Sequence, residues 1–553
     1  MSRPRPLVPA ALARGSHAAV VAPHHLAAEA GLGVLRAGGS AVDAAIATNA
    51  ALAVVAPNSC GLGGDAFWLI WDEASGSLLA LNGSGRAPAG VDPAALRASG
   101  LERLPLRGPL TITVPGAVRS WADAHARFGR LSLPTILGPA IELAADGFPA
   151  WDGFIASVEA TAELLPRAGV DPSGWAALFR PAGRPWRPGE RVRLPALAAT
   201  LGHLATVGLD DFYAGELAER QAAALAAAGS PLRLDDFRAH TSTWGAPISV
   251  DYRGVTVASH PPNSSGIVAL EILGILAACA PPPPDAFGPD GVADPDWIHL
   301  GIEAAKLAFA DRDAHLSDPD VVPVPVARLL DPSRLARLAA DLDRTRARIP
   351  EPARNPAGGG TVAFAAVDAE GNVVSAIESH YLGFGSGIAD PATGIHYQNR
   401  GAYFSLDPEH PNVLAPGKRT LHTLLPWMLL RDGRPWIAGG SMGGDAQPQI
   451  CAQLVSALVD GGVDVATAVA APRWFVDPAE HFAPPVTVRI EPRFAAGVVA
   501  ALRERGHPVT PVGAFDALLG HAHAIELVDG GPARGGSLSA ATDPRSAGLP
   551  AVW

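Results

Sequence analysis

Apolar and polar positions follow two different periods at the start of the chain. Helical spacing of apolar residues covers 26–35 and 41–55, and the pair Gly38-Gly39 between them is a helix stop signal. Two short apolar runs within 66–82 flank the turn sequence Ala74-Ser-Gly, which predicts two strands. This opening therefore predicts alternating helices and strands.

The rest of the chain continues this alternation. Helical spacing dominates from about 115 to 230, 251–259 is typical of a strand, and 263–278 is typical of a helix. After residue 361 the pattern predicts mainly strands, with helices near the ranges 447–460, 464–471 and 493–505. The pattern indicates an α/β protein but does not specify how its sheets are arranged.

A further predicted helix, 297–311, places His299, Glu303 and Lys306 on one face. These side chains could bind a metal or form an ion pair. Polar faces of helices more often contact solvent, so we interpret this one as a solvated surface and expect no metal site.

Charge and composition narrow the class of protein. The chain has 553 residues, 42 of them basic and 54 acidic, and its net charge of −12 argues against nucleic acid or an anionic membrane as partner. The apolar stretch 41–56 is interrupted by Asp43 and is too short to cross a bilayer. The opening Met1-Ser-Arg-Pro-Arg-Pro lacks the apolar core of a signal peptide. We expect a cytoplasmic enzyme, and its three widely spaced cysteines imply no disulfide framework.

The segment Gly358-Gly359-Gly360-Thr361 carries the strongest candidate chemistry. Thr361 opens an apolar, β-prone run that ends near Asp368. Glycines tolerate the strained backbone that attack of the hydroxyl on the preceding carbonyl would need. Cleavage after Gly360 would free the α-amine of Thr361, which could then act as base for its own hydroxyl. Taken alone, the segment is more typical of an ordinary glycine-rich loop before a strand.

Further segments help to interpret the Gly358-Gly359-Gly360-Thr361 segment, because together they resemble the γ-glutamyltransferase family of N-terminal-nucleophile hydrolases. The resemblance runs from about residue 18 to residue 545 and is carried by Leu35-Arg-Ala-Gly-Gly-Ser-Ala-Val-Asp-Ala-Ala45, Gly61-Leu-Gly-Gly-Asp65, Pro261-Pro-Asn-Ser-Ser-Gly266, Pro416-Gly-Lys-Arg419 and Gly440-Ser-Met-Gly-Gly444. Each string alone is weak, but their shared order over most of the chain is specific.

The resemblance implies a fold and a mode of action. It implies a four-layer α-β-β-α sandwich made of two autoprocessed chains, a large subunit 1–360 and a small subunit 361–553 that begins with the nucleophile Thr361. Such an enzyme takes an acyl group from a small-molecule amide and passes it to water or an amine, without a cofactor. The two subunits of the same precursor would be its protein partners.

The resemblance also assigns roles around Thr361. Gly443 and Gly444 match the glycine pair whose N–H groups form the oxyanion hole, where each donor contributes about 3–4 kcal/mol. Ser379 matches a hydroxyl residue that orients the nucleophile. An exposed strand serine remains the alternative for Ser379, and a tight turn without catalytic role remains the alternative for the glycine pair.

The predicted acyl pocket departs from that of the glutathione-cleaving members. The arginine that holds the α-carboxylate there aligns with Ser84, although Arg86 lies close by. The acid that holds the α-amine aligns with Tyr403, three residues after Arg400. The remaining predicted substrate-binding positions are Tyr381, His422 and Thr423.

A buried ammonium without an acid is costly, so these residues favour an acyl group with a carboxylate and no amine. This pattern resembles the branch that includes oxamate amidohydrolases and glutaryl-type cephalosporin acylases. Arg86 and Arg400 could instead form surface or structural pairs.

Three other interpretations remain open. One is a true glutathione hydrolase and γ-glutamyl transpeptidase that binds the amine differently. Another is an α/β-hydrolase, because Gly439-Gly440-Ser441-Met442-Gly443 matches the G-x-S-x-G elbow and is followed by Asp460 and His507. The last is a non-catalytic binding homologue, which the presence of Thr361 and the glycine pair argues against.

Overall fold

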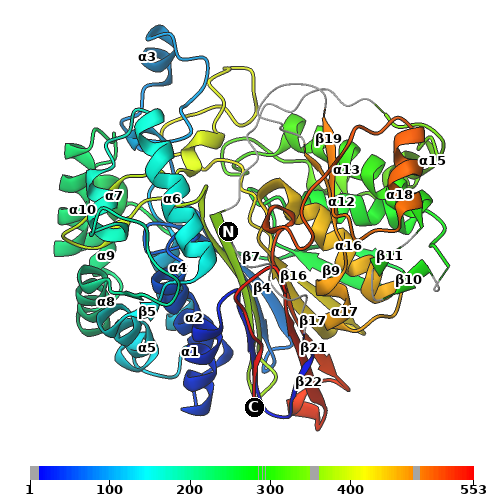
Figure 1. Cartoon of the computed structure of the whole chain (residues 1–553), viewed down its shortest axis with the longest axis horizontal. Helices are drawn as coiled ribbons and strands as arrows, with labels where there is room; N and C mark the ends of the chain where they lie inside the picture. Colours follow the sequence, from blue (N-terminus) through cyan, green and yellow to red (C-terminus); the bar gives the residue numbers. More distant parts are fainter. Residues whose placement is uncertain (1–10, 284–285, 289–290, 293, 349–359, 478–485) are drawn as a thin grey trace.

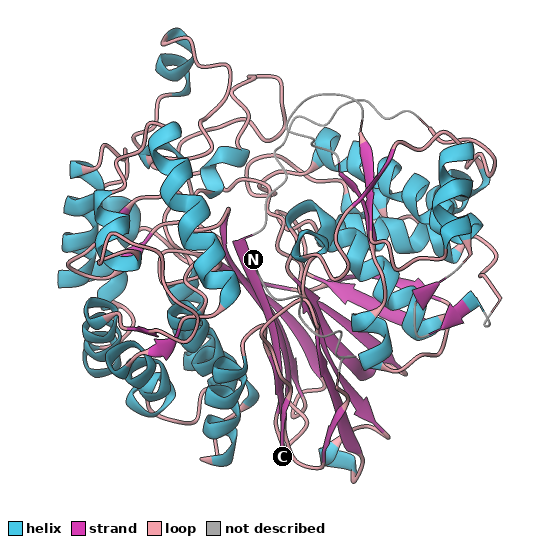
Figure 2. Ribbon diagram, in the orientation of Figure 1, coloured by secondary structure: helices cyan, strands magenta, loops and turns pink. Residues whose placement is uncertain are grey.

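The computed structural model describes residues 11–283, 286–288, 291, 292, 294–348, 360–477 and 486–553. Its centre consists of two antiparallel seven-stranded sheets, which we call sheet I and sheet II. Helices cover the outer side of each sheet, so the molecule has four layers in the order α-β-β-α (Figures 1 and 2). This confirms the predicted sandwich.

Both sheets combine strands from the two ends of the chain. Sheet I has the order β23 (Ala551–Val552), β2 (Ala19–Val21), β12 (Gly360–Val367), β13 (Val373–Tyr381), β3 (Asp65–Asp72), β4 (Ser77–Gly83) and β7 (Thr243–Gly245). Sheet II has the order β1 (Ala13–Gly15), β22 (Ser537–Thr542), β21 (Ala522–Val528), β17 (Arg434–Ser441), β16 (Trp427–Arg431), β9 (Val255–Ser259) and β8 (Ile248–Tyr252). Each sheet therefore contains strands from before and after Thr361.

Two groups of helices form the outer layers (Figure 1). The layer over sheet I contains α1 (His25–Arg36), α2 (Ala41–Val55), α4 (Ala117–Phe128), α5 (Leu133–Asp146), α6 (Asp152–Arg167), α8 (Pro195–Val207) and α10 (Glu216–Ala227). The layer over sheet II contains α12 (Gly266–Ala277), α13 (Pro295–His315), α16 (Gln447–Val459), α17 (Val465–Ala470) and α18 (Ala496–Glu504). Beyond them, β18 (Trp474–Asp477), β19 (Thr487–Ile490) and β20 (Val509–Pro511) form a small sheet.

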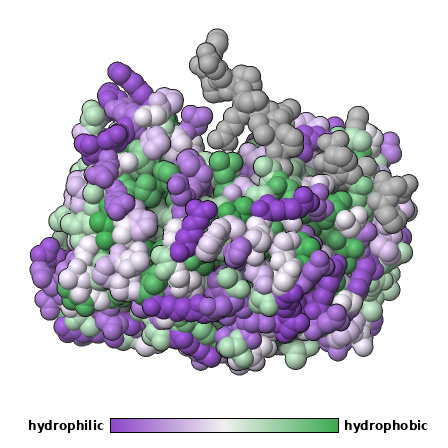
Figure 3. Space-filling model, turned by 90° about the horizontal axis from the view of Figure 1, so that it is seen from below, coloured by the Kyte–Doolittle hydropathy of each residue, from purple (hydrophilic) through white to green (hydrophobic). Residues whose placement is uncertain are grey.

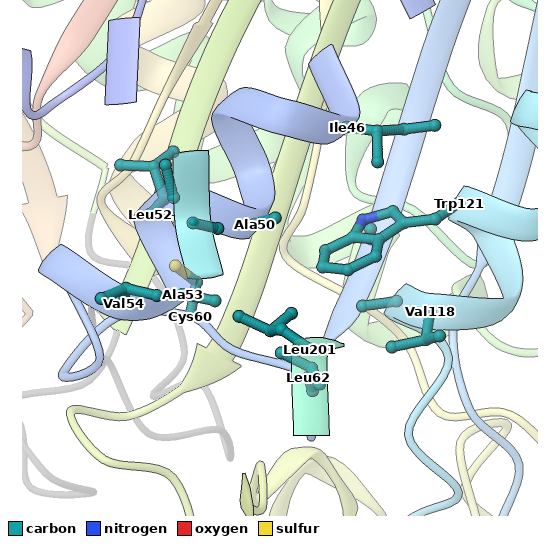
Figure 4. Close-up of a cluster of buried hydrophobic side chains, with 14 of the residues drawn as sticks. Ile46, Ala50, Leu52, Ala53, Val54, Cys60, Leu62, Val118, Trp121 and Leu201 are labelled. Atoms are coloured by element: carbon teal, nitrogen blue, oxygen red, sulfur yellow. The ribbon is translucent and has the colours of Figure 1, made fainter. Parts of the chain in front are cut away.

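Three apolar interfaces hold the four layers together. The first packs sheet I against its helices, the second packs sheet II against its helices, and the third lies between the sheets. Figure 4 shows part of the first, where Ile46 and Val118 lie on either side of Trp121. The Trp121 indole N–H donates to Asn49 Oδ1 over 2.8 Å, which satisfies a buried donor. The outer surface seen from below mixes polar and apolar residues (Figure 3).

Helix α2 has the bounds that the sequence predicts, and its start shows why. Ser40 accepts a hydrogen bond from the Asp43 N–H over 3.1 Å, and Asp43 accepts one from the Ser40 N–H over 3.0 Å. This reciprocal capping box fixes the first turn. Every residue of α2 is buried, so the helix forms a rigid support behind sheet I.

Two predictions about elements need correction. The single strand 251–259 is a hairpin of β8 and β9, because Arg253 adopts a φ of 55° and Gly254 one of 82°. The polar face of α13 is buried rather than solvated: His299 Nδ1 lies 2.7 Å from His507 Nε2, and Lys306 Nζ donates to Glu303 over 2.7 Å. Packing of the segment that follows α18 covers this face.

Among the described residues, no helix has the length and apolar character needed to cross a bilayer. The three cysteines, Cys60, Cys279 and Cys451, are buried free thiols, in agreement with the expectation that they form no disulfide framework.

Candidate active site

Thr361 is the second residue of β12 and is 3% exposed. Pairing with β13 puts it opposite Ser379, and the register shifts between Gly360 and Thr361. The irregularity therefore lies at the peptide bond for which the sequence predicts cleavage. The glycines Gly358 and Gly359 lie outside the described residues.

The Ser379 hydroxyl connects the Thr361 hydroxyl to the Gly360 carbonyl. Thr361 Oγ1 donates to Ser379 Oγ over 2.9 Å, and Ser379 Oγ donates to Gly360 O over 2.7 Å. The Tyr381 N–H donates to the same Ser379 oxygen over 2.7 Å. Ser379 is buried, so the exposed-serine alternative does not hold.

The glycine pair follows the end of β17. Gly443 has a φ of 145° and Gly444 a φ of 55°, conformations that favour glycine. A short 3-10 turn, η4 (Gly444–Ala446), then leads into α16. No acceptor among the described residues is hydrogen-bonded to the N–H of Gly443 or Gly444, so both donors are available for an oxyanion.

A cavity of about 990 Å³ brings Thr361 and Gly443 to one surface. Its walls come from both halves of the sandwich and include Trp151, Met442 and Phe475. A cavity of this size can hold a drug-sized ligand. Thr361 and Gly443 therefore line one cavity.

Arg400 lies behind the nucleophile, in the 3-10 helix η3 (Arg400–Tyr403). Its guanidinium donates to Ser379 Oγ over 3.2 Å and to Thr423 Oγ1 over 3.1 Å. Arg400 is 1% exposed and forms no ion pair with a carboxylate of the described residues. Burial lowers the pKa of Arg400, but an arginine in a protein stays protonated.

Two tyrosines enclose this guanidinium. Arg400 Cζ lies 4.7 Å from the ring centre of Tyr381 and 5.5 Å from that of Tyr403. Tyr381 has a φ of 74°, an uncommon conformation for a non-glycine residue. The cation–π contacts compensate part of the cost of burying the charge. The structure thus brings together Arg400, Tyr381, Tyr403 and Thr423 next to Ser379.

His422 has a supporting position. Its Nε2 lies 3.2 Å from Asp65 Oδ2, and both side chains are buried. Burial raises the pKa of Asp65 to about 7 and lowers the pKa of His422 well below its usual value. The contact is therefore a hydrogen bond from a neutral imidazole rather than an ion pair. It ties the segment around Thr423 to β3.

Arg86 and Ser84 lie in a different environment. The Arg86 guanidinium pairs with Asp318 and Asp320, each over 3.3 Å, and it does not line the Thr361 cavity. Ser84 Oγ donates to Asn82 Oδ1 over 2.7 Å. Within the described part of the chain, Arg86 forms no hydrogen bond with Ser379 or Arg400.

Asp445 is a site residue that the sequence reasoning missed. Its Oδ1 accepts hydrogen bonds from Arg312 over 2.8 Å and from the Tyr403 hydroxyl over 3.2 Å. Its Oδ2 has no hydrogen-bond partner among the described residues, and the side chain lines the Thr361 cavity. Burial raises the pKa of Asp445, an effect that Arg312 opposes. Its position next to the glycine pair was a usable signal, but its pairing with α13 was not visible in the sequence.

The Ser441 elbow does not form a triad with Asp460 and His507. Ser441 Oγ donates to the neighbouring Met442 carbonyl over 2.7 Å. His507 contacts His299, and Asp460 contacts Tyr252. Neither the acid nor the histidine that follows the elbow therefore reaches Ser441.

The fold and the site define a class of enzyme. A four-layer sandwich with a hydroxyl residue at the head of a central strand, next to a glycine turn, is the arrangement of N-terminal-nucleophile hydrolases. The family model described as gamma-glutamyltranspeptidase matches residues 27–553. The chain belongs to this family and is one of its hydrolase or acyltransferase enzymes.

Individual relatives agree with this assignment. The oxamate amidohydrolase proenzyme of Klebsiella pneumoniae is 41% identical, over 97% of this chain and 99% of its own length. The glutathione hydrolase-like YwrD proenzyme of Bacillus subtilis is 39% identical, over 97% and 98%. The crystal structure of cephalosporin acylase from Bacillus halodurans superposes with a TM-score of 0.90 at 38% identity, over 100% of this chain and 98% of the other.

Proposed function

We propose that this enzyme is made as a precursor, cleaves itself between Gly360 and Thr361, and uses Thr361 to hydrolyse an amide through an ester intermediate. The observation that carries this proposal is the hydrogen-bonded series from Thr361 through Ser379 to the Gly360 carbonyl. The names of the relatives as proenzymes support the processing step. Gly443 and Gly444 supply the oxyanion donors in this scheme.

For the substrate, we propose an amide whose acyl group carries a carboxylate and no amine. Arg400 provides a buried cation 3.2 Å from Ser379 Oγ, and Tyr403 takes the place that an acid would need to hold an ammonium group. This substrate role requires that departure of Gly360 expose the buried Arg400 to the cavity, and we include that opening in the proposal. The similarity to an oxamate amidohydrolase is consistent with such a substrate.

One observation supports the alternative of a γ-glutamyl substrate. Asp445 is one of the residues that line the cavity, and its buried Oδ2 lacks a hydrogen-bond partner among the described residues, so the carboxylate could accept a hydrogen bond from an ammonium group. Arg312 already compensates its charge, so we rank this alternative second.

The kcat/KM values of two matched substrates, glutaryl anilide and γ-glutamyl anilide, distinguish the two substrate proposals. We expect a higher kcat/KM for the glutaryl compound, because the amine of the γ-glutamyl compound would be buried with no carboxylate free to pair with it. After its precursor has been allowed to cleave completely, Arg400→Ala should raise KM for glutaryl anilide at least tenfold and change KM little for a neutral butyryl anilide. A tenfold preference for the γ-glutamyl compound, abolished in Asp445→Asn, would instead establish the γ-glutamyl alternative.

A further inference from the structure

The environment of Ser379 Oγ is unusual for a serine hydroxyl. Three donors point at this one oxygen: Thr361 Oγ1 at 2.9 Å, the Tyr381 N–H at 2.7 Å and Arg400 Nη2 at 3.2 Å. A hydroxyl oxygen has two lone pairs, so the donors exceed what a neutral serine accepts. Such convergence suits an oxygen that becomes negatively charged during a reaction.

Arg400 supplies the charge in this arrangement. Its other side-chain hydrogen bond to a described residue, from Nη1 to Thr423 Oγ1 at 3.1 Å, fixes the guanidinium plane. A fully buried arginine without a paired carboxylate among the described residues is costly to fold. The guanidinium donates to the Ser379 hydroxyl, which in turn bridges Thr361 and the Gly360 carbonyl.

From this geometry we infer that Arg400 is a positioning residue for self-cleavage, acting through Ser379 on the bond between Gly360 and Thr361. This role rests on the proposed self-cleavage and differs from the role of Arg400 in holding substrate. It belongs to the unbroken chain, in which Arg400 is 1% exposed and does not line the cavity.

The step balances without any outside reagent. Thr361 Oγ1 forms a bond to the Gly360 carbonyl carbon, and the carbonyl π electrons move to the oxygen. Ser379 gives its proton to that oxygen and receives the proton of Thr361, while Arg400 and the Tyr381 N–H stabilise the negative charge that passes through Ser379 Oγ. The bond from carbon to nitrogen then breaks, the new hydroxyl proton moves to the nitrogen, and the carbonyl re-forms as an ester. Water hydrolyses that ester and leaves Thr361 with a free α-amine.

The test follows cleavage of freshly made precursor after a pulse of cell-free synthesis, by intact mass. Arg400→Lys and Arg400→Met both keep an unbranched side chain between the tyrosines and differ in charge. We expect the Met variant to cleave at least tenfold more slowly than the Lys variant. Arg419→Gln is the matched control, because Arg419 is also buried but donates to the main chain at Ser84 and Thr241. It should cleave within twofold of the wild-type rate.

Hydroxylamine distinguishes the acyl shift from the later hydrolysis, because it cuts an ester wherever one has accumulated. It should not speed cleavage of the Met variant, in which the ester forms slowly. Equal rates for the Lys and Met variants, or rapid cleavage of the Met variant by hydroxylamine, would overturn the inference. If circular dichroism shows the Met variant unfolded, Thr423→Val decides: slower cleavage supports the role, and the wild-type rate overturns it. A wild-type chain that never cleaves would instead overturn the proposed self-cleavage.

Discussion

At the scale of single residues, the site rests on a small set of hydrogen bonds around one hydroxyl. Ser379 joins the nucleophile to the scissile carbonyl, and its own position is fixed from the Tyr381 main chain. Tyr381 keeps a positive φ of 74° to make that contact. Strain of this kind, of the order of 1–3 kcal/mol, persists where the surrounding structure imposes it and is typical of active sites.

The two hydroxyl candidates, Thr361 and Ser441, give opposite predictions. Thr361→Ala should remove both processing and amide hydrolysis, because it deletes the proposed nucleophile. Ser441→Ala should keep processing and most activity, since the Ser441 hydroxyl donates to a main-chain carbonyl. Mass analysis and an amide-hydrolysis assay of both variants check this. An inactive Ser441→Ala together with an active Thr361→Ala would assign the chemistry to the elbow.

Local sequence drew attention to some candidate site residues and missed others. Thr361 and Gly443 stood out because a glycine run before a strand and a glycine pair after one are local signals, but the family resemblance was needed to assign their roles. The contact between Asp445 and Arg312 joins positions 133 residues apart, and the spacing of apolar residues in the sequence does not indicate it. Arg86 illustrates the converse, because its nearness to Ser84 suggested a ligand role while the fold places Asp318 and Asp320 beside it.

At the scale of elements, β13 connects the site to the helical layer. Glu378, next to Ser379, is fully buried on the opposite side of the sheet. Its carboxylate accepts a hydrogen bond from Asn49 of α2 and one from the Gly61 N–H over 2.8 Å. Burial raises the pKa of Glu378 to about 8.

This pKa predicts a pH-dependent stability. A carboxyl group whose pKa is raised in the folded state binds its proton more tightly there, so its contribution to stability falls as pH rises from the unfolded pKa of 4.5 to about 8. Glu378→Gln should remove this dependence. The variant should therefore gain stability relative to wild type from pH 5 to pH 8, by about 1–4 kcal/mol.

Urea unfolding at pH 5, 6.5 and 8 measures the difference. Glu216→Gln, at an exposed ion pair on α10, serves as control and should stay parallel to wild type. Parallel curves for Glu378→Gln would show that Glu378 does not titrate as its burial implies.

Elements with strong local signals were predicted well, and elements defined by packing were not. Helix α2 follows its capping box and apolar spacing, so its bounds match the prediction. The buried face of α13 was misjudged because the residues that cover it, including His507, come from the far end of the chain. A polar face looks the same in sequence whether water or a distant segment contacts it.

At the scale of the whole molecule, the order of strands determines what cleavage can do. Strand β12 lies between β2 and β13, and β13 pairs with β3. In sheet II, β16 pairs with β9. A break before Thr361 therefore leaves both sheets built from both chains, and neither chain can leave without opening a hydrophobic core.

The most direct test is mass analysis of one preparation, under native conditions before substrate is added and under denaturing conditions after acid quench during turnover of a carboxylate-bearing amide. We expect one native assembly with the mass of the full chain plus the one water added by cleavage, which denaturation separates into residues 1–360 and 361–553. We also expect part of the second chain to carry the acyl mass on Thr361, as peptide mapping would show. An active protein that remains uncleaved, or an acyl group found on Ser441 or any other residue, would contradict the account.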